Sequence, residues 1–135
     1  MSRSGYSDDC EYLELYRATV DRTIAGKRGQ AFLREMATAM DAMPEKKLIA
    51  DELINAEGAC CAIGTVCKAR NIDVSKVDYY DPDEVGKLVG ISRSLAAEIE
   101  YINDDDFRYG ESPEHRWERI RKWIDKNLME PVAVS

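Results

Sequence analysis

The chain has 135 residues, of which 44% are apolar and 33% are charged, and its formal net charge is −7. This length fits one domain with a core that needs neither a metal ion nor disulfides. No apolar run approaches the roughly 20 residues of a membrane-spanning helix, so we expect a soluble protein that binds no membrane.

The negative charge is concentrated in residues 71–111. This stretch holds eleven acids and four bases, and the difference of seven equals the whole net charge of −7. Residues 113–128, by contrast, hold five bases and three acids. The acidic majority argues against direct nucleic-acid binding and favours a basic protein partner.

The fold class predicted from the periodicity is mainly α, a single compact domain of five or six helices with at most one short β-hairpin. Residues 1–8 are polar and lack periodicity, which predicts an N-terminal arm. We expect the helical domain to cover residues 9–130, with a tail over residues 131–135.

Two helices are predicted in the first third of the chain. The first runs from about Asp9 to Ile24, and Gly26 is expected in the left-handed conformation beyond its end. Residues 26–29 are predicted to form a connector between the helices. The second helix then runs to Met43, and Pro44 ends it.

The middle of the chain is predicted to form a short hairpin followed by a helix. Glu57 and Gly58 lie between two short apolar runs, which is typical of a tight turn. The helix is expected over about Ala62 to Arg70.

Capping residues predict three helices in the second half. Asp81, followed by a proline, opens a short helix that Gly90 closes. Ser92 caps the next helix, which ends near Asn103. Ser112 opens the last helix, whose apolar stripe begins at Trp117.

The four cysteines, Cys10, Cys60, Cys61 and Cys67, follow no secretory leader, so we expect reduced thiols in a cytosolic compartment. Their spacing does not match the paired ligands of structural zinc. A thiol nucleophile would need His115 as its base, yet His115 is expected on the surface. The interpretation that we favour is that the cysteines are small buried residues.

Three further features of the sequence are candidate binding sites. The carboxylates of 104–106 could hold magnesium or calcium, but an acidic contact for a partner is favoured. Lys27 and Arg28 could hold an anion at a helix start, although a solvated turn is favoured. Arginines beside Trp123 on the last helix resemble the centre of an interface.

We assign no catalytic, cofactor-binding or metal-binding residue. The candidate partner-binding residues are Arg3, Tyr6, Lys27, Arg28, Asp104, Asp105, Asp106, Arg116, Arg119 and Trp123.

The chain resembles an uncharacterised family of small proteins encoded by tailed phages and prophages. The matching pieces are Ser2–Asp9 (SRSGYSDD), Gly26–Phe32 (GKRGQAF), Cys61–Gly64 (CAIG), Asn103–Asp104, and Pro113–Glu114 followed by Arg116. The resemblance implies expression in a bacterial host and carries over no catalytic residue.

The leading hypothesis is therefore a non-enzymatic protein that binds and modulates or inhibits a host protein or complex in the host cytoplasm. Its acidic surface could imitate nucleic acid toward a host defence complex. One alternative is a small enzyme or a metal- or ligand-binding domain using the 104–106 loop or Cys61 with His115. The other is a nucleic-acid binder that uses the basic last helix with Lys27 and Arg28.

Overall fold

The computed structural model describes residues 10–104 and 110–129. As predicted, this part of the chain is mainly helical, and it contains six helices and no strand. The helices are α1 (Cys10–Ala25), α2 (Lys27–Asp41), α3 (Ala62–Ala69), α4 (Pro82–Val89), α5 (Arg93–Asp104) and α6 (Pro113–Asn127). The expected N-terminal arm and C-terminal tail lie outside the described residues.

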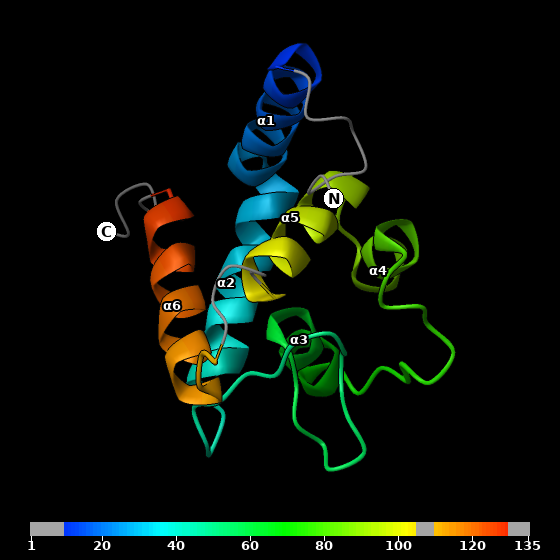
Figure 1. The fold of residues 1–135 in the computed structure, drawn as a ribbon, viewed down its shortest axis with the longest axis vertical. Helices are drawn as coiled ribbons and strands as arrows, with labels where there is room; N and C mark the ends of the chain where they lie inside the picture. Colours follow the sequence, from blue (N-terminus) through cyan, green and yellow to red (C-terminus); the bar gives the residue numbers. More distant parts are fainter. Residues whose placement is uncertain (1–9, 105–109, 130–135) are drawn as a thin grey trace.

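Two helices organise the packing. Helix α2 contacts α1, α3 and α6, while α5 contacts α1, α3, α4 and α6. Figure 1 shows α6 beside α2, with α4 and α5 on the other side of the molecule and α3 below them. None of the helices in the described residues is both long enough and apolar enough to cross a membrane.

The core lies between these helices and follows the predicted apolar stripes. Leu33, Met36 and Met40 on α2 are fully buried, as are Ile120 and Ile124 on α6. The methionines of α2 are thus core residues, which is the role that their helical spacing predicts.

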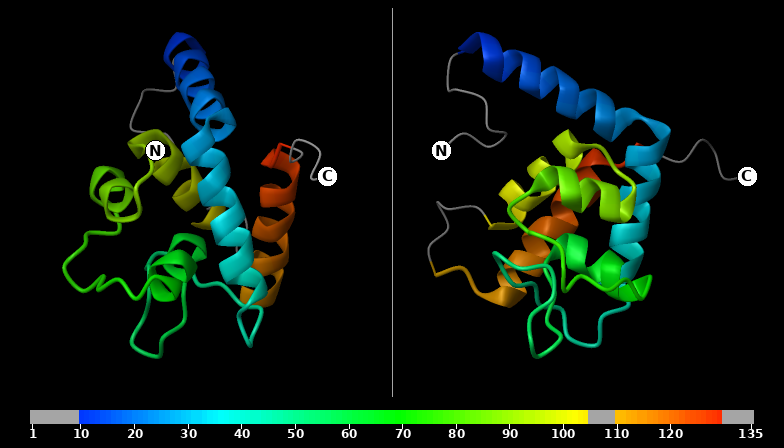
Figure 2. Two further views of the ribbon diagram at one scale, coloured as in Figure 1. Left: turned by 180° about the vertical axis from the view of Figure 1, so that it is seen from behind. Right: turned by 90° about the vertical axis from the view of Figure 1, so that its right-hand side faces the viewer.

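The predicted connector over residues 26–29 is wrong, because α2 already begins at Lys27. Only Gly26 separates the two helices, and it is extended (φ −70°) instead of left-handed. The chain turns sharply at this point, which is clearest in the right-hand view of Figure 2. A Cβ atom at Gly29 would lie only 1.9 Å from the Thr23 carbonyl oxygen, so the close approach of α1 and α2 requires glycine there.

The predicted hairpin is reduced to a single antiparallel bridge between Ile54 and Cys60. The Asn55 side chain closes the turn by accepting bonds from the backbone N–H groups of Glu57 and Ala59. These side-chain bonds replace the strand ladder that the apolar runs suggested.

The caps predicted in the second half are confirmed. Asp81 accepts bonds from the first turn of α4, and Gly90 ends that helix with a φ of 82°. The hydroxyls of Ser92 and Ser112 accept bonds from the N–H groups of Leu95 and His115, respectively. Short-range capping chemistry therefore sets where these helices begin and end.

We expect Gly29→Ala to lower the free energy of unfolding by about 2–3 kcal/mol, because its methyl group forces α1 and α2 apart. Urea denaturation measures this change. Gly26→Ala is the matched control, since its Cβ would lie 3.4 Å from the nearest atom, the Arg22 carbonyl oxygen. We expect the control to cost about 0.5–1 kcal/mol, the usual loss on placing alanine at a helix cap. Equal losses for the two variants would contradict this explanation of the turn.

Candidate functional site

Arg116 and Arg119, both predicted to bind a partner, point into the molecule. Their side chains are only 11% and 14% exposed. The Arg119 guanidinium donates to the Ile102 carbonyl at 2.7 Å, and that of Arg116 donates to the Asn103 carbonyl at 2.9 Å. The last carbonyls of a helix carry partial negative charge and lack partners within the helix. The two arginines of α6 therefore cap the C-terminal end of α5.

A buried carboxylate balances these arginines. The side chain of Glu111 is 3% exposed and accepts two bonds from Arg119, at 2.7 and 2.9 Å. The bonds from Arg119, together with a bond from His115, lower the pKa of Glu111 to about 2. The charge of Glu111 is thus used inside the protein.

The rest of α6 is also largely occupied. Arg121 pairs with Asp41 and Asp125, at 2.9 and 2.6 Å. Trp123 is half-buried and packs against the core instead of standing free on the surface. Among the described residues, Lys122 and Lys126 are the exposed cations of α6 that form no ion pair, so the free cationic surface that nucleic-acid binding requires is limited to these two lysines.

At the C-terminal end of α5, hydrogen bonds of Asn103 and Asp104 gather other segments of the chain. Asn103 is 1% exposed and fixes this end: its side-chain amide accepts a bond from the Ala62 N–H and donates one to the Ile49 carbonyl. The neighbouring Asp104 accepts bonds from the Tyr79 hydroxyl at 2.8 and 2.9 Å. These bonds bring three segments that are distant in sequence to the end of one helix.

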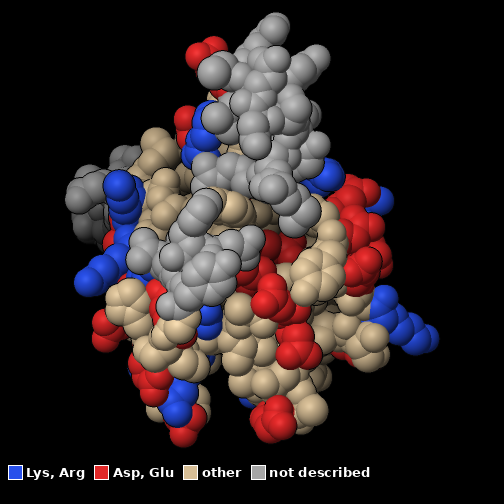
Figure 3. Space-filling view, in the orientation of Figure 1, with Lys and Arg blue, Asp and Glu red and all other residues tan. Residues whose placement is uncertain are grey.

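The result is a group of carboxylates that we call the acidic cluster. Each of these carboxylates interacts electrostatically with another member or with the Tyr80 hydroxyl. The members are Asp51, Glu52, Asp78, Asp81, Glu100 and Asp104. Figure 3 shows acidic side chains gathered from the centre to the right of the molecule, over α4 and α5.

Glu100 shows most clearly how the carboxylates of the cluster act on one another. Burial, followed by the negative charges of Asp104, Asp78 and Asp81, raises the pKa of Glu100 to about 8. Within residues 10–104 and 110–129, no lysine or arginine forms an ion pair with Glu100. Glu100 and Asp104 are also like charges one helical turn apart, a spacing that destabilises a helix.

An exposed aromatic residue lies beside the cluster. Tyr80 is 72% exposed and stacks edge-on against Tyr79, with ring centroids 5.3 Å apart. Loss of hydration and the charges of Asp51, Asp104 and Asp78 raise the pKa of its hydroxyl. An exposed tyrosine rimmed by charge is typical of a protein interface.

Most other described acids of residues 71–111 interact with partners outside the acidic cluster. Asp83 pairs with Lys87 at 3.4 Å, and the buried Glu98 accepts bonds from Tyr16 and Arg17 of α1. The acidic stretch as a whole therefore does not form one surface. Of the predicted loop only Asp104 is described, and Asp105 and Asp106 lie outside the described residues.

The sequence interpretation missed five of the six members of the acidic cluster. The four-residue spacing of Glu100 and Asp104 was an available signal for a shared helical face. Nothing in the sequence pattern indicated that residues 51–52 and 78–81 would join them, because this depends on the long-range bonds of Asn103 and Asp104.

Cys60, Cys61 and Cys67 are buried free thiols. Cys61 is 1% exposed and caps α3, its sulfur accepting a bond from the Gly64 N–H at 3.3 Å. Burial raises the pKa of the Cys61 thiol well above its usual range, which disfavours a nucleophilic thiolate. The His115 side chain is 59% exposed and bonds to Glu111 instead of a cysteine. Among the described residues, no group of three or more potential ligands is arranged to hold a metal ion.

The other predicted residues are not brought to the acidic cluster. Lys27 and Arg28 lie in the first turn of α2, where they line a separate hollow with Ser92. Arg3 and Tyr6 lie outside the described residues. No protein-family model matches the chain, and neither a curated protein nor a solved structure matches it.

Glu111→Gln should lower the free energy of unfolding at pH 7 by about 1–3 kcal/mol, since two arginines lose a buried counterion. A lowered pKa stabilises the folded state above the ordinary value of 4.5, and that stabilisation is lost as pH falls toward 2. The difference between wild type and variant should therefore shrink toward zero in acid. Denaturation at several pH values measures it.

Glu114→Gln is the control for this prediction, because the Glu114 side chain is 59% exposed and its oxygen lies 3.9 Å from Lys47 Nζ. An exposed pair of this kind contributes little to stability. A Glu111→Gln effect that does not change between pH 7 and pH 2 would show that the Glu111 network is not electrostatic.

Proposed function

We propose that the chain is a non-enzymatic binding protein whose acidic cluster, with Tyr80 beside it, docks onto a basic surface of a partner protein. The observation that carries the proposal is the crowding of carboxylates around Glu100, with which no lysine or arginine of the described residues forms an ion pair. Such crowding destabilises the free protein, and a lysine or arginine supplied by a partner would relieve it.

The disposition of charges favours a protein partner over direct nucleic-acid binding. The arginines of α6 are engaged with carbonyls and carboxylates of the protein, whereas no lysine or arginine in the described part of the chain pairs with the acidic cluster. Tyr80 would supply apolar contact area at the centre of the interface, and the carboxylates would steer the encounter.

The resemblance to phage and prophage proteins leads us to propose a host protein or complex in the cytoplasm as the partner. Carboxylates presented by a rigid fold can occupy the positions of phosphates on a nucleic-acid-binding surface. The finer proposal is therefore inhibition of a host nucleic-acid-binding complex, including a defence complex, by imitation of its ligand.

The test compares two charge-matched double variants in affinity capture from the bacterial host, with quantitative mass spectrometry. Asp51→Asn with Glu52→Gln removes two exposed charges from the acidic cluster. Glu14→Gln with Glu118→Gln removes two exposed charges on α1 and α6. We expect the first double variant to capture about tenfold less partner than the wild type, and the second to capture as much as the wild type.

Two further readouts separate the versions of this function. High salt should release the partner, because screening weakens an exposed charged interface. Double-stranded DNA should compete for the partner if the acidic cluster imitates nucleic acid. Equal capture by the two double variants would contradict the proposed function as a whole.

A further inference from the structure

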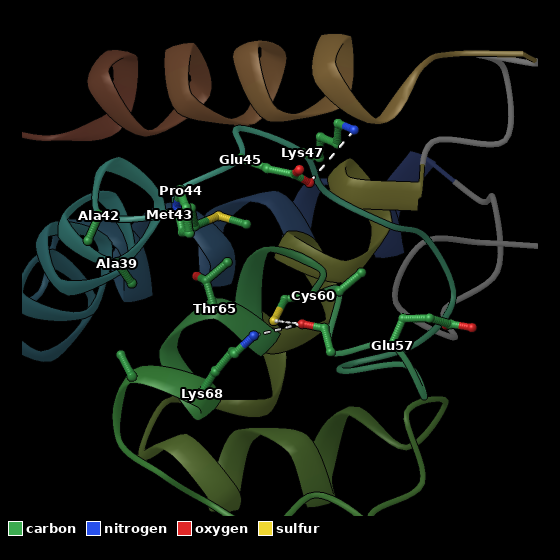
Figure 4. A pocket seen from close by; sticks show the side chains of 13 residues that line it. Ala39, Ala42, Met43, Pro44, Glu45, Lys47, Glu57, Cys60, Thr65 and Lys68 are labelled. Carbon is green, nitrogen blue, oxygen red and sulfur yellow. Dashed lines mark hydrogen bonds and ion pairs between the residues drawn. The ribbon is translucent and has the colours of Figure 1, made fainter.

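A second feature lies away from the acidic cluster. A groove of about 530 Å³ opens between the end of α2, the turn at residues 57–60 and α3 (Figure 4). Its walls are mostly apolar and small, formed by Ala39, Ala42, Met43, Pro44, Ala59 and Ala69. This volume and this lining are typical of a site for a small organic molecule. None of the acidic cluster residues lines the groove.

The groove contains one cation without a carboxylate partner. Lys68 Nζ donates to the Gly58 carbonyl at 2.9 Å and forms no ion pair with any residue in the described ranges. Lys47, by contrast, lies 3.8 Å from Glu45 and 3.9 Å from Glu114. In Figure 4 the carboxylate of Glu57 is directed away from the Lys68 ammonium group.

Two other polar side chains of the groove already donate hydrogen bonds. The Thr65 hydroxyl donates to the Ala62 carbonyl at 2.6 Å, and the Cys60 thiol donates to the Gly58 carbonyl at 3.5 Å. Their carbon and sulfur atoms therefore add to the apolar wall. An occupant of this groove needs an apolar body and a single anionic group.

We propose that this groove binds a small apolar monocarboxylate, with its hydrocarbon part along the alanines and its carboxylate on the Lys68 ammonium group. Charge complementarity selects this class. One ammonium group matches one negative charge, while Glu45 and Glu57 at the rim repel ligands that carry several.

The test uses octanoate and its neutral counterpart octanol, each titrated into the ¹⁵N-labelled full chain and followed by NMR. We expect saturable shifts at the amides of the groove for octanoate, with octanol binding about tenfold more weakly. Lys68→Gln should weaken octanoate binding about tenfold, to the level of octanol, and leave octanol binding unchanged.

Two variants control for the position of the site. Lys47→Gln removes the neighbouring cation and should leave octanoate affinity within about twofold, because that cation is already paired. Ala39→Leu adds volume at a half-buried position of the wall and should abolish binding of both compounds. The ¹⁵N spectrum of each variant reports whether the fold is retained.

Equal affinity for octanoate and octanol would overturn the role of Lys68. Shifts outside the groove, or the lack of a saturable shift, would overturn the site itself. Neither result bears on the acidic cluster, which is tested separately by partner capture.

Discussion

The C-terminal end of α5 is the point on which the rest of the structure depends. Arg116 and Arg119 of α6 donate to its last carbonyls, and the buried amide of Asn103 joins it to Ile49 and to the first turn of α3. A helix end of this kind carries partial negative charge and unpaired acceptors, so it is stable in the interior only when donors are supplied. Here the donors come from other helices. The same principle operates where Gln30 donates to the Ile24 and Asn127 carbonyls at the ends of α1 and α6.

This capping divides the charges of the protein into two groups. The guanidinium groups of Arg116 and Arg119 face inward, where they bond to carbonyls and to Glu111, and they are not available to phosphates. At the same helix end, Glu100 and Asp104 interact electrostatically with acids from the 51–52 and 78–81 segments, and no cation of residues 10–104 or 110–129 pairs with them. Three of the five cations of the last helix pair with carboxylates of the protein, whereas no lysine or arginine of the described residues pairs with the acidic cluster. The arrangement therefore favours a basic partner over nucleic acid.

The sequence could predict the parts of the fold that depend on local chemistry. Ser112, Asp81 and Gly90 cap helices at the predicted positions because capping involves only near neighbours. The start of α2 could not be predicted, since Gly26 and Gly29 suggest a loop unless the close crossing over Thr23 is known. The inward orientation of Arg116 and Arg119 could not be predicted either, because it also depends on contacts between distant segments. Helical spacing places both residues on one face, but their acceptors belong to α5 and to residue 48.

The central claim is that the fold crowds carboxylates together at the end of α5, where no cation of the described residues pairs with them. The most direct measurement is an NMR titration of the Glu100 side-chain carboxyl carbon in the free protein. We expect a pKa of about 8, because burial and the neighbouring acids favour the protonated form. A pKa near the ordinary value of 4.5 would show that Glu100 is well hydrated or paired, and the acidic cluster would lose its basis as a docking site.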